Sequence, residues 1–256
     1  MYIHLTTHSA FSLQEGLLTP TELAQAAQVS GMMALGLTDR NLLTGVIEFV
    51  TACKAADIQP IIGLELDLND GPVSLFATSL EGWSCLCRLS SNISLRDNPD
   101  ASCTLGMLAS SSQDLIAVSK QPQLLTEIFP DRLYINIQNP NEAENLSNLA
   151  RQLGLPTVIM HPIYYLTPEQ AGLQRTLTAI RLAKTITTLP KDAGAPPDAY
   201  FISAQQMQER YQQYPKAIAA TREIAERCKF DLPIGSSQMS KVPLQDGVTA
   251  AQHLHE

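Results

Sequence analysis

Residues 34–68 read ALGLTDRNLLTGVIEFVTACKAADIQPIIGLELDL and carry the clearest information on the architecture of this chain. Two apolar runs, 34–39 and 60–68, have the composition of buried strands, and apolar residues recur at helical spacing in residues 46–56 between them. A strand, a helix and a second strand in succession favour a parallel sheet or barrel, because the helix supplies the crossover that parallel strands need.

The same alternation continues along the first part of the chain. Further strand-like runs lie at residues 3–6, 73–77, 115–119, 133–137 and 157–160, and helices fit between most of them. Seven strand candidates in this arrangement predict an α/β fold built as a closed or nearly closed β/α barrel.

Capping residues mark the helix boundaries. Thr19-Pro20-Thr21-Glu22 is a capping box with proline at the first helical position, and Gly31 ends that helix. Further helices are predicted from Asn139 to Gly154, from Thr167 to about residue 186, from the capping box at Ser203, and over residues 215–228.

Two segments rich in Ser, Asn, Asp, Pro and Gly, residues 90–113 and 187–198, are predicted as loops. From Pro233 onward the chain is polar and rich in turn-forming residues. We therefore predict one barrel domain over residues 1–235 and a polar connector over residues 236–256, leading away from the domain.

The composition limits the classes of partner. A formal charge of −8 argues against direct binding of nucleic acid by this chain alone, because phosphate contacts need clustered Lys and Arg. The five cysteines form no zinc-binding pattern. Their odd number, with no signal peptide and no long apolar run, indicates a reduced cytoplasmic protein without a membrane segment.

Candidate functional residues follow the predicted strands. His8, Asp39, Glu65, Ser119 and His161 each lie at or near the carboxyl end of a predicted strand, where barrels carry their functional side chains. Their positions agree with one shared site, to which a His, an Asp and a Glu could bring metal ligands.

These motifs identify a resemblance. The chain is similar to the PHP (polymerase and histidinol phosphatase) domain of bacterial DNA polymerase III alpha subunits, through YIHLTTHSAFSLQEGLL, the MMALGLTDRN…IIGLEL stretch, YLTPEQA and TREIAERCKFDLP, in the family's order. The resemblance implies a distorted seven-stranded β/α barrel with extra C-terminal helices. It also implies a mouth that, in active members, binds two or three metals and hydrolyses phosphoesters.

The implied ligand positions are only partly kept. The opening H-x-H pattern falls on Thr6 and His8, so its first His is lost. The T-D-H pattern keeps Asp39 but carries Arg40 in place of its His, and Glu65 is retained in the third strand. Arg40 is a permanent cation and a donor only, so it cannot coordinate a metal.

The later motifs are degenerate as well. Ser119 stands where the family usually carries another ligand, and the N-D-x-H pattern falls on His161-Pro162-Ile163-Tyr164, with Tyr164 in place of the final His. We expect no metal cofactor. If the site is partly functional, Zn or Mn would be held by His8, Asp39, Glu65 and His161.

Two of these residues have alternative interpretations. Arg40 is hypothesised to pair with Glu65 or Asp39 and to replace the metal as the neutralising charge; alternatively, it is an ordinary surface residue. His8 is expected to be a hydrogen-bonded residue of the barrel mouth rather than a leftover ligand, and His4, outside the ligand pattern, to be structural.

The resemblance implies a role in DNA replication. We expect a structural and docking domain, catalytically inactive on its own, whose partners are the remainder of a polymerase III alpha subunit and a proofreading exonuclease. Whether the chain is an enzyme stays open. The alternatives are a metal-dependent phosphoesterase or 3′–5′ exonuclease with a reduced site, and a stand-alone inactive PHP protein that acts as a binding module.

Overall fold

The computed structural model describes residues 1–96, 102–191 and 193–235. Its centre is a curled six-stranded sheet in which the spatial order of the strands follows the sequence. The strands are β1 (Ala34–Leu37), β2 (Gln59–Leu68), β3 (Gly71–Ala77), β4 (Leu115–Ser119), β5 (Leu133–Ile137) and β6 (Thr157–Ile159). Six of the seven predicted strands are thus confirmed, with bounds that differ by a few residues at most.

The sheet is mixed rather than all-parallel. β1 pairs with β2, β4 with β5 and β5 with β6 in parallel, whereas β3 runs antiparallel to both of its neighbours. The turn explains this: Leu68 pairs with Gly71 across only two residues, too short for the crossover of a parallel pair. Gly71 has φ +121, which a side chain would disfavour.

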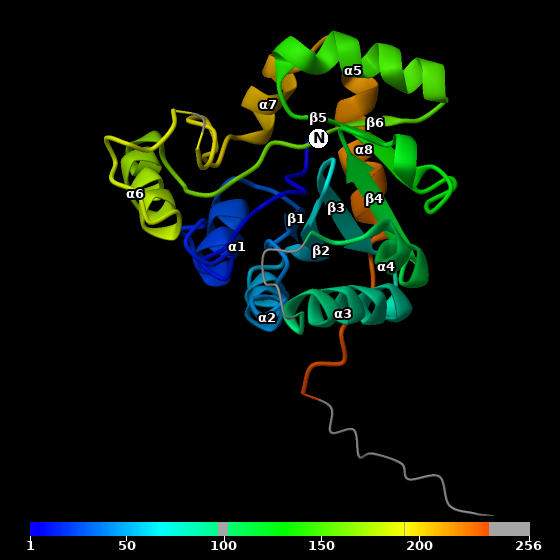
Figure 1. The fold of residues 1–256 in the computed structure, drawn as a ribbon, viewed down its shortest axis with the longest axis horizontal. Helices are drawn as coiled ribbons and strands as arrows, with labels where there is room; N and C mark the ends of the chain where they lie inside the picture. The colour runs from blue at the N-terminus through cyan, green and yellow to red at the C-terminus, as the bar shows by residue number, and fades with distance from the viewer. Residues whose placement is uncertain (97–101, 192, 236–256) are drawn as a thin grey trace, which may run out of the picture.

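The predicted strand at residues 3–6 does not form. The segment nevertheless hydrogen-bonds on both sides: the Gly36 amide donates to the His4 carbonyl (2.8 Å), and the Ile163 amide donates to the Thr6 carbonyl (3.2 Å). It therefore lies between β1 and the chain that follows β6. The described sheet is a half-barrel of six strands, with this irregular segment beside β1 (Figure 1).

Eight α-helices surround the sheet in the described residues. They are α1 (Pro20–Val29), α2 (Val46–Ala55), α3 (Leu80–Ser94), α4 (Leu105–Ser110), α5 (Pro140–Leu153), α6 (Ala171–Arg181), α7 (Ala204–Arg210) and α8 (Pro215–Arg227). The capping box at Thr19 and Glu22, the Asn139 cap and the box at Ser203 and Gln206 all form as predicted. Gly154 ends α5 in the left-handed conformation.

The prediction of a loop over residues 90–113 is wrong at residues 90–94 and 105–110, and its residues 97–101 lie outside the described residues. α3 continues to Ser94, and α4 occupies part of the segment, with Thr104 as its N-cap. The Ser and Asn residues are mostly on the outer side of α3, while Leu86, Leu89 and Ile93 are buried at helical spacing. Composition alone missed this amphipathic pattern.

The helix predicted from Thr167 to about residue 186 is shorter. Thr167 does form a capping box, but with Gln170 of a short 3-10 helix (Pro168–Gln170), and α6 then ends at Arg181. Ala183 has φ +50, and the Thr185 and Thr188 hydroxyls bond to each other and to nearby backbone. Hydroxyl groups that satisfy the backbone locally compete with a continued helix.

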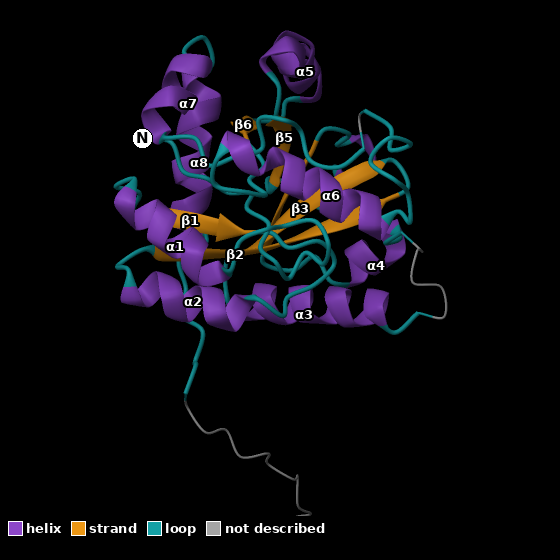
Figure 2. Cartoon of the chain, turned by 90° about the vertical axis from the view of Figure 1, so that its left-hand side faces the viewer, coloured by secondary structure: helices purple, strands orange, loops and turns teal. Residues whose placement is uncertain are grey.

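α2 and α3 follow one another end to end along one side of the sheet, α1 packs beside α2, and α8 lies behind the sheet in the view of Figure 1 (Figures 1 and 2). The largest apolar cluster joins α1, α2 and α3 to the strands, and a second fills the inside of the curl with Leu5, Ile61, Phe76 and Ile116. In the described chain, no helix has both the length and the apolar character needed to cross a membrane. The predicted connector at 236–256 lies outside the described residues.

Candidate functional site

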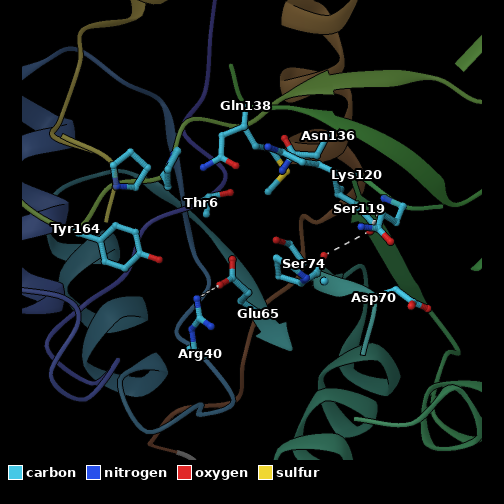
Figure 3. A pocket seen from close by; sticks show the side chains of 17 residues that line it. Thr6, Arg40, Glu65, Asp70, Ser74, Ser119, Lys120, Asn136, Gln138 and Tyr164 are labelled. Carbon is cyan, nitrogen blue, oxygen red and sulfur yellow. Dashed lines mark hydrogen bonds and ion pairs between the residues drawn. The ribbon is translucent and has the colours of Figure 1, made fainter. Parts of the chain in front are cut away.

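One end of the sheet, formed by the carboxyl ends of the parallel strands and the amino end of β3, surrounds a cavity of about 250 Å³ (Figure 3). Its lining includes Thr6, Arg40, Glu65, Ser119, Lys120, Asn136, Gln138 and Tyr164. All but Thr6 come from a strand or from the segment that follows one, where barrel folds place functional groups, and Thr6 belongs to the irregular segment beside β1. Five of the eight predicted site residues therefore share one cavity: Thr6, Arg40, Glu65, Ser119 and Tyr164.

Arg40 is the centre of charge in this mouth. The backbone places it there: the Glu65 amide donates to the Asp39 carbonyl and the Asn41 amide to the Glu65 carbonyl, which extends the β1–β2 ladder by one step. The Arg40 guanidinium then lies 3.1 Å from Glu65 Oε1, 3.1 Å from Glu15 Oε2 and 2.8 Å from Asp67 Oδ1.

These three contacts differ in kind. Arg40 Nη1 donates a hydrogen bond to Asp67, whereas Arg40 Nε and Glu15 Oε2 lie close without the alignment of a hydrogen bond. Burial opposes the charge of Arg40, but Glu65 and Glu15 outweigh it and raise the pKa of the guanidinium above its ordinary value. Arg40 therefore stays protonated and pairs with the carboxylates of Glu15, Glu65 and Asp67.

Glu65 and His8 face each other beneath the cavity. His8 Nε2 lies 3.8 Å from Glu65 Oε2, and the His8 ring stacks on Tyr164 with centroids 4.2 Å apart. Burial and the nearby Arg40 lower the pKa of His8 to about 3, so the ring is neutral at pH 7 and the contact is no ion pair. Burial raises the pKa of Glu65 to about 7, against the opposing effect of Arg40.

The Asp39 side chain bonds to two serines rather than to Arg40. Its Oδ1 accepts from the Ser9 amide and the Ser12 hydroxyl, and its Oδ2 accepts from the Ser9 hydroxyl, each at 2.7 Å. Burial raises the pKa of Asp39, although these hydrogen bonds work against the rise. The Asp39 carboxylate is thus engaged by residues 9–12, and of the two partners predicted for Arg40, Glu65 is the one observed.

His161 also lies apart from the mouth. Its Nε2 donates to the Tyr200 carbonyl at 3.1 Å, and the ring borders a smaller neighbouring cavity with Asp198 and Arg210. Burial lowers the pKa of His161. His4 is likewise buried, with Nε2 donating to the Ile202 carbonyl at 2.6 Å.

Several residues of the mouth were not predicted from the sequence. Asp67 could have been found, because it lies two residues after Glu65 in β2 and so shares its face. Asn136 lies near the end of β5, Gln138 directly follows that strand, and Lys120 directly follows β4. Glu15 comes from an irregular loop, and its sequence position carries no such signal.

The predicted ligands do not converge as a metal cluster. His8 and Glu65 face each other, Asp39 is bound by serines, and His161 bonds to a backbone carbonyl. Over the described ranges, no group of three or more His, Cys, Asp or Glu residues is placed to hold an ion. Glu65 and the buried, unpartnered Nε2 of His8 are the two donors that could contact one.

The family model of the PHP domain matches residues 4–153 of this chain. The chain belongs to the PHP domain family. It is 27% identical to DNA polymerase III subunit alpha of Bacillus subtilis, over 99% of the chain and 25% of that protein. It is 29% identical to Error-prone DNA polymerase 2 of Agrobacterium fabrum, over 98% of the chain and 25% of that protein.

These matches confirm the resemblance to the PHP domain of polymerase III alpha subunits. This PHP chain spans about a quarter of the length of the curated relatives it matches. Among solved structures, an amidohydrolase from Chromobacterium violaceum is 14% identical, with a TM-score of 0.41, over 64% of this chain and 88% of that one. A likeness of that degree carries no argument about the site.

Proposed function

We propose that this PHP domain is a structural and docking part of a replicative or error-prone DNA polymerase of the polymerase III alpha type, and that it does not hydrolyse phosphoesters on its own. The observation that supports this most is Arg40, which lies among Glu15, Glu65 and Asp67 in the mouth. In our proposal the guanidinium takes the place of a metal as the charge that these carboxylates need.

The electrostatics favour this interpretation over a metal cluster. An ion bound at Glu65 Oε1 would lie close to the guanidinium that already pairs with that oxygen at 3.1 Å. A divalent cation about 4 Å from a unit positive charge is repelled by about 8 kcal/mol at an effective dielectric constant of about 20. Arg40 cannot lose its proton to relieve this repulsion.

The proposed partners are the remainder of a polymerase chain and, by family resemblance, a proofreading exonuclease. The relatives are about four times as long as this chain, which supports the first partner. Residues 1–235 would form the domain and residues 236–256 the connector. A structural domain of this kind needs an intact scaffold, and the buried sheet and capped helices supply one.

One observation favours a second candidate, a phosphoesterase with a reduced site. His8 Nε2 and the Thr6 hydroxyl are buried without a hydrogen-bond partner in the described structure, next to Glu65 and the cavity. Buried polar atoms usually have partners, and water or a ligand often supplies them. A single Zn or Mn ion on His8 and Glu65 would polarise a bound water for attack on a phosphoester.

Metal analysis combined with a phosphodiesterase assay distinguishes the two candidates. We expect less than stoichiometric metal in the purified chain and no cleavage of bis(p-nitrophenyl) phosphate with added Mn²⁺ or Zn²⁺. Metal-dependent turnover that Glu65→Ala abolishes would overturn the structural proposal. Asp70→Ala is the matched control, because Asp70 is a carboxylate on the rim of the same cavity.

A further inference from the structure

Helix α6 exposes two large apolar side chains and buries two polar ones. Leu173 and Ile180 are 56% and 59% exposed, and Leu177 between them is half-buried. The spacing i, i+4, i+7 places these three side chains, the α6 stripe, on one side of the helix. Scattered exposed apolar residues are ordinary, but a stripe at helical spacing indicates an interaction surface.

The inward face of α6 is held by hydrogen bonds. Gln174 and Thr178 are buried, the Gln174 amide group donates to the Glu15 carbonyl, and the Ala195 amide donates back to Gln174 Oε1. Rolling the helix to bury the stripe would break these bonds and leave buried polar groups unpaired. The polar contacts therefore keep the α6 stripe facing outward.

The charge around α6 is opposite to that of the whole chain. Residues 170–191 carry Arg175, Arg181, Lys184 and Lys191 and no Asp or Glu, in a chain of formal charge −8, and the segment is flanked in sequence by Glu169 and Asp192. Among the ion pairs of the described residues, only Arg181 of these four has a carboxylate partner, the buried Glu15 that also pairs with Arg40. Arg175 donates to the Leu189 and Pro190 carbonyls, so its charge has no carboxylate beside it in these ion pairs. The segment is thus locally cationic as well as apolar.

We propose that the α6 stripe docks an acidic amphipathic segment of a partner protein. Such a segment would set Leu-type side chains at helical spacing against Leu173, Leu177 and Ile180, with Asp or Glu residues facing the cations of the segment. This proposal rests on the docking role proposed above. Its observations come from α6 and not from the barrel mouth.

Charge and area favour this partner over the alternatives. Nucleic acid would meet the cations but not the exposed leucine and isoleucine side chains, and the chain as a whole would repel it. A membrane surface would need a longer apolar face than three residues on an 11-residue helix provide.

The test is an NMR titration of the labelled chain with a synthetic helix-forming peptide that has Leu at helical spacing and Glu at the flanking positions. We expect saturating shifts of the amides of residues 171–186, with a Kd on the order of 100 μM. The Leu173→Ser/Ile180→Ser double variant should bind at least about tenfold more weakly, because two buried aliphatic contacts are lost. Ile47→Ser is the matched control, since Ile47 is 50% exposed on α2.

Several results would overturn the proposal: no shift at residues 171–186 up to about 1 mM peptide, or equal binding of a peptide with Lys in place of Glu. So would shifts of these amides by duplex DNA or anionic vesicles in place of the peptide, or by raising the protein concentration alone. The metal and phosphodiesterase measurements do not involve α6, so either proposal can fail without the other.

Discussion

Arg40 pairs with two nearly buried carboxyl groups, those of Glu15 and Glu65, and with the more exposed carboxylate of Asp67. The dense charge of this mouth comes from three separate segments: the loop before α1, the end of β1 and strand β2. Removing one partner of a buried ion pair is costly because the remaining charge stays in a poorly solvated place.

Arg40→Met should therefore lower the free energy of unfolding by about 3 kcal/mol at pH 7, the low end for such pairs because the guanidinium is 31% exposed. Urea denaturation measures this. Arg88→Met is the control, because the Arg88–Glu81 pair is half-exposed and should change stability by less than about 1 kcal/mol. Equal losses in the two variants would contradict the buried-charge interpretation.

His4 provides a test of pH dependence outside the mouth. Burial lowers the pKa of His4 to about 3, below its unfolded value of 6.5. A depressed histidine pKa means that the folded state binds fewer protons, so the stability is present above pH 6.5 and is lost as the pH falls toward 3. Glu65 acts in the opposite direction, since its raised pKa costs stability as the pH rises toward about 7.

His4→Gln keeps a donor for the Ile202 carbonyl but cannot titrate. The variant should lose stability less steeply below pH 6.5, by up to about 1.4 kcal/mol per pH unit relative to the parent chain. Urea denaturation from pH 7.5 down to pH 4.5 gives both curves, and Glu65 contributes equally to each. Parallel curves would show that His4 already titrates near its unfolded value.

At the scale of elements, the contact between β1 and residues 3–6 depends on Gly36. A Cβ built at Gly36 would lie 2.1 Å from the Leu5 carbonyl oxygen, and the backbone of that segment cannot yield as a flexible side chain could. The missing side chain therefore allows the irregular segment to pack against β1, which places Thr6 in the lining of the cavity and His8 beneath it, against Glu65.

Gly36→Ala should destabilise the chain by about 3 kcal/mol or more, because the two backbones must separate. Gly172→Ala is the matched control: nothing lies within 4 Å of its Cβ position, and alanine in helix α6 should add about 0.5–1 kcal/mol. Thermal unfolding of the two variants measures both. A tolerated Gly36→Ala would mean that residues 3–6 do not pack as tightly as described.

At the scale of the whole molecule, a bound metal would stabilise the fold by mass action. An ion at 100 times its Kd adds about 2.7 kcal/mol, which raises the Tm of a domain of this size by roughly 5–10 °C. Under the proposed structural role, Mn²⁺ or Zn²⁺ should shift the Tm by less than about 1 °C, and EDTA should have no effect. A rise of several degrees that Glu65→Gln removes would instead support the reduced phosphoesterase.

Local signals explain why much of the fold could be predicted. β4 and β5 have their predicted bounds, and the helix starts at Thr19, Asn139 and Ser203 have their predicted caps. These features depend on residues within a few positions of one another. The prediction of a strand at residues 3–6 was wrong because the backbone partners of this segment, near residues 36 and 163, could not be identified from composition.

In the candidate site, too, some features could be predicted from the sequence and others depend on contacts between distant segments. That Arg40 is a permanent cation beside Asp39, and that Glu65 lies in a strand, follow from the sequence alone, as does family membership. The tertiary structure decided which carboxylates Arg40 serves, that Asp39 instead bonds to Ser9 and Ser12, and that α6 turns its apolar stripe outward. The reason is physical: secondary structure is set by short-range spacing and capping, whereas charge pairing and burial depend on distances between segments that only the folded chain brings together.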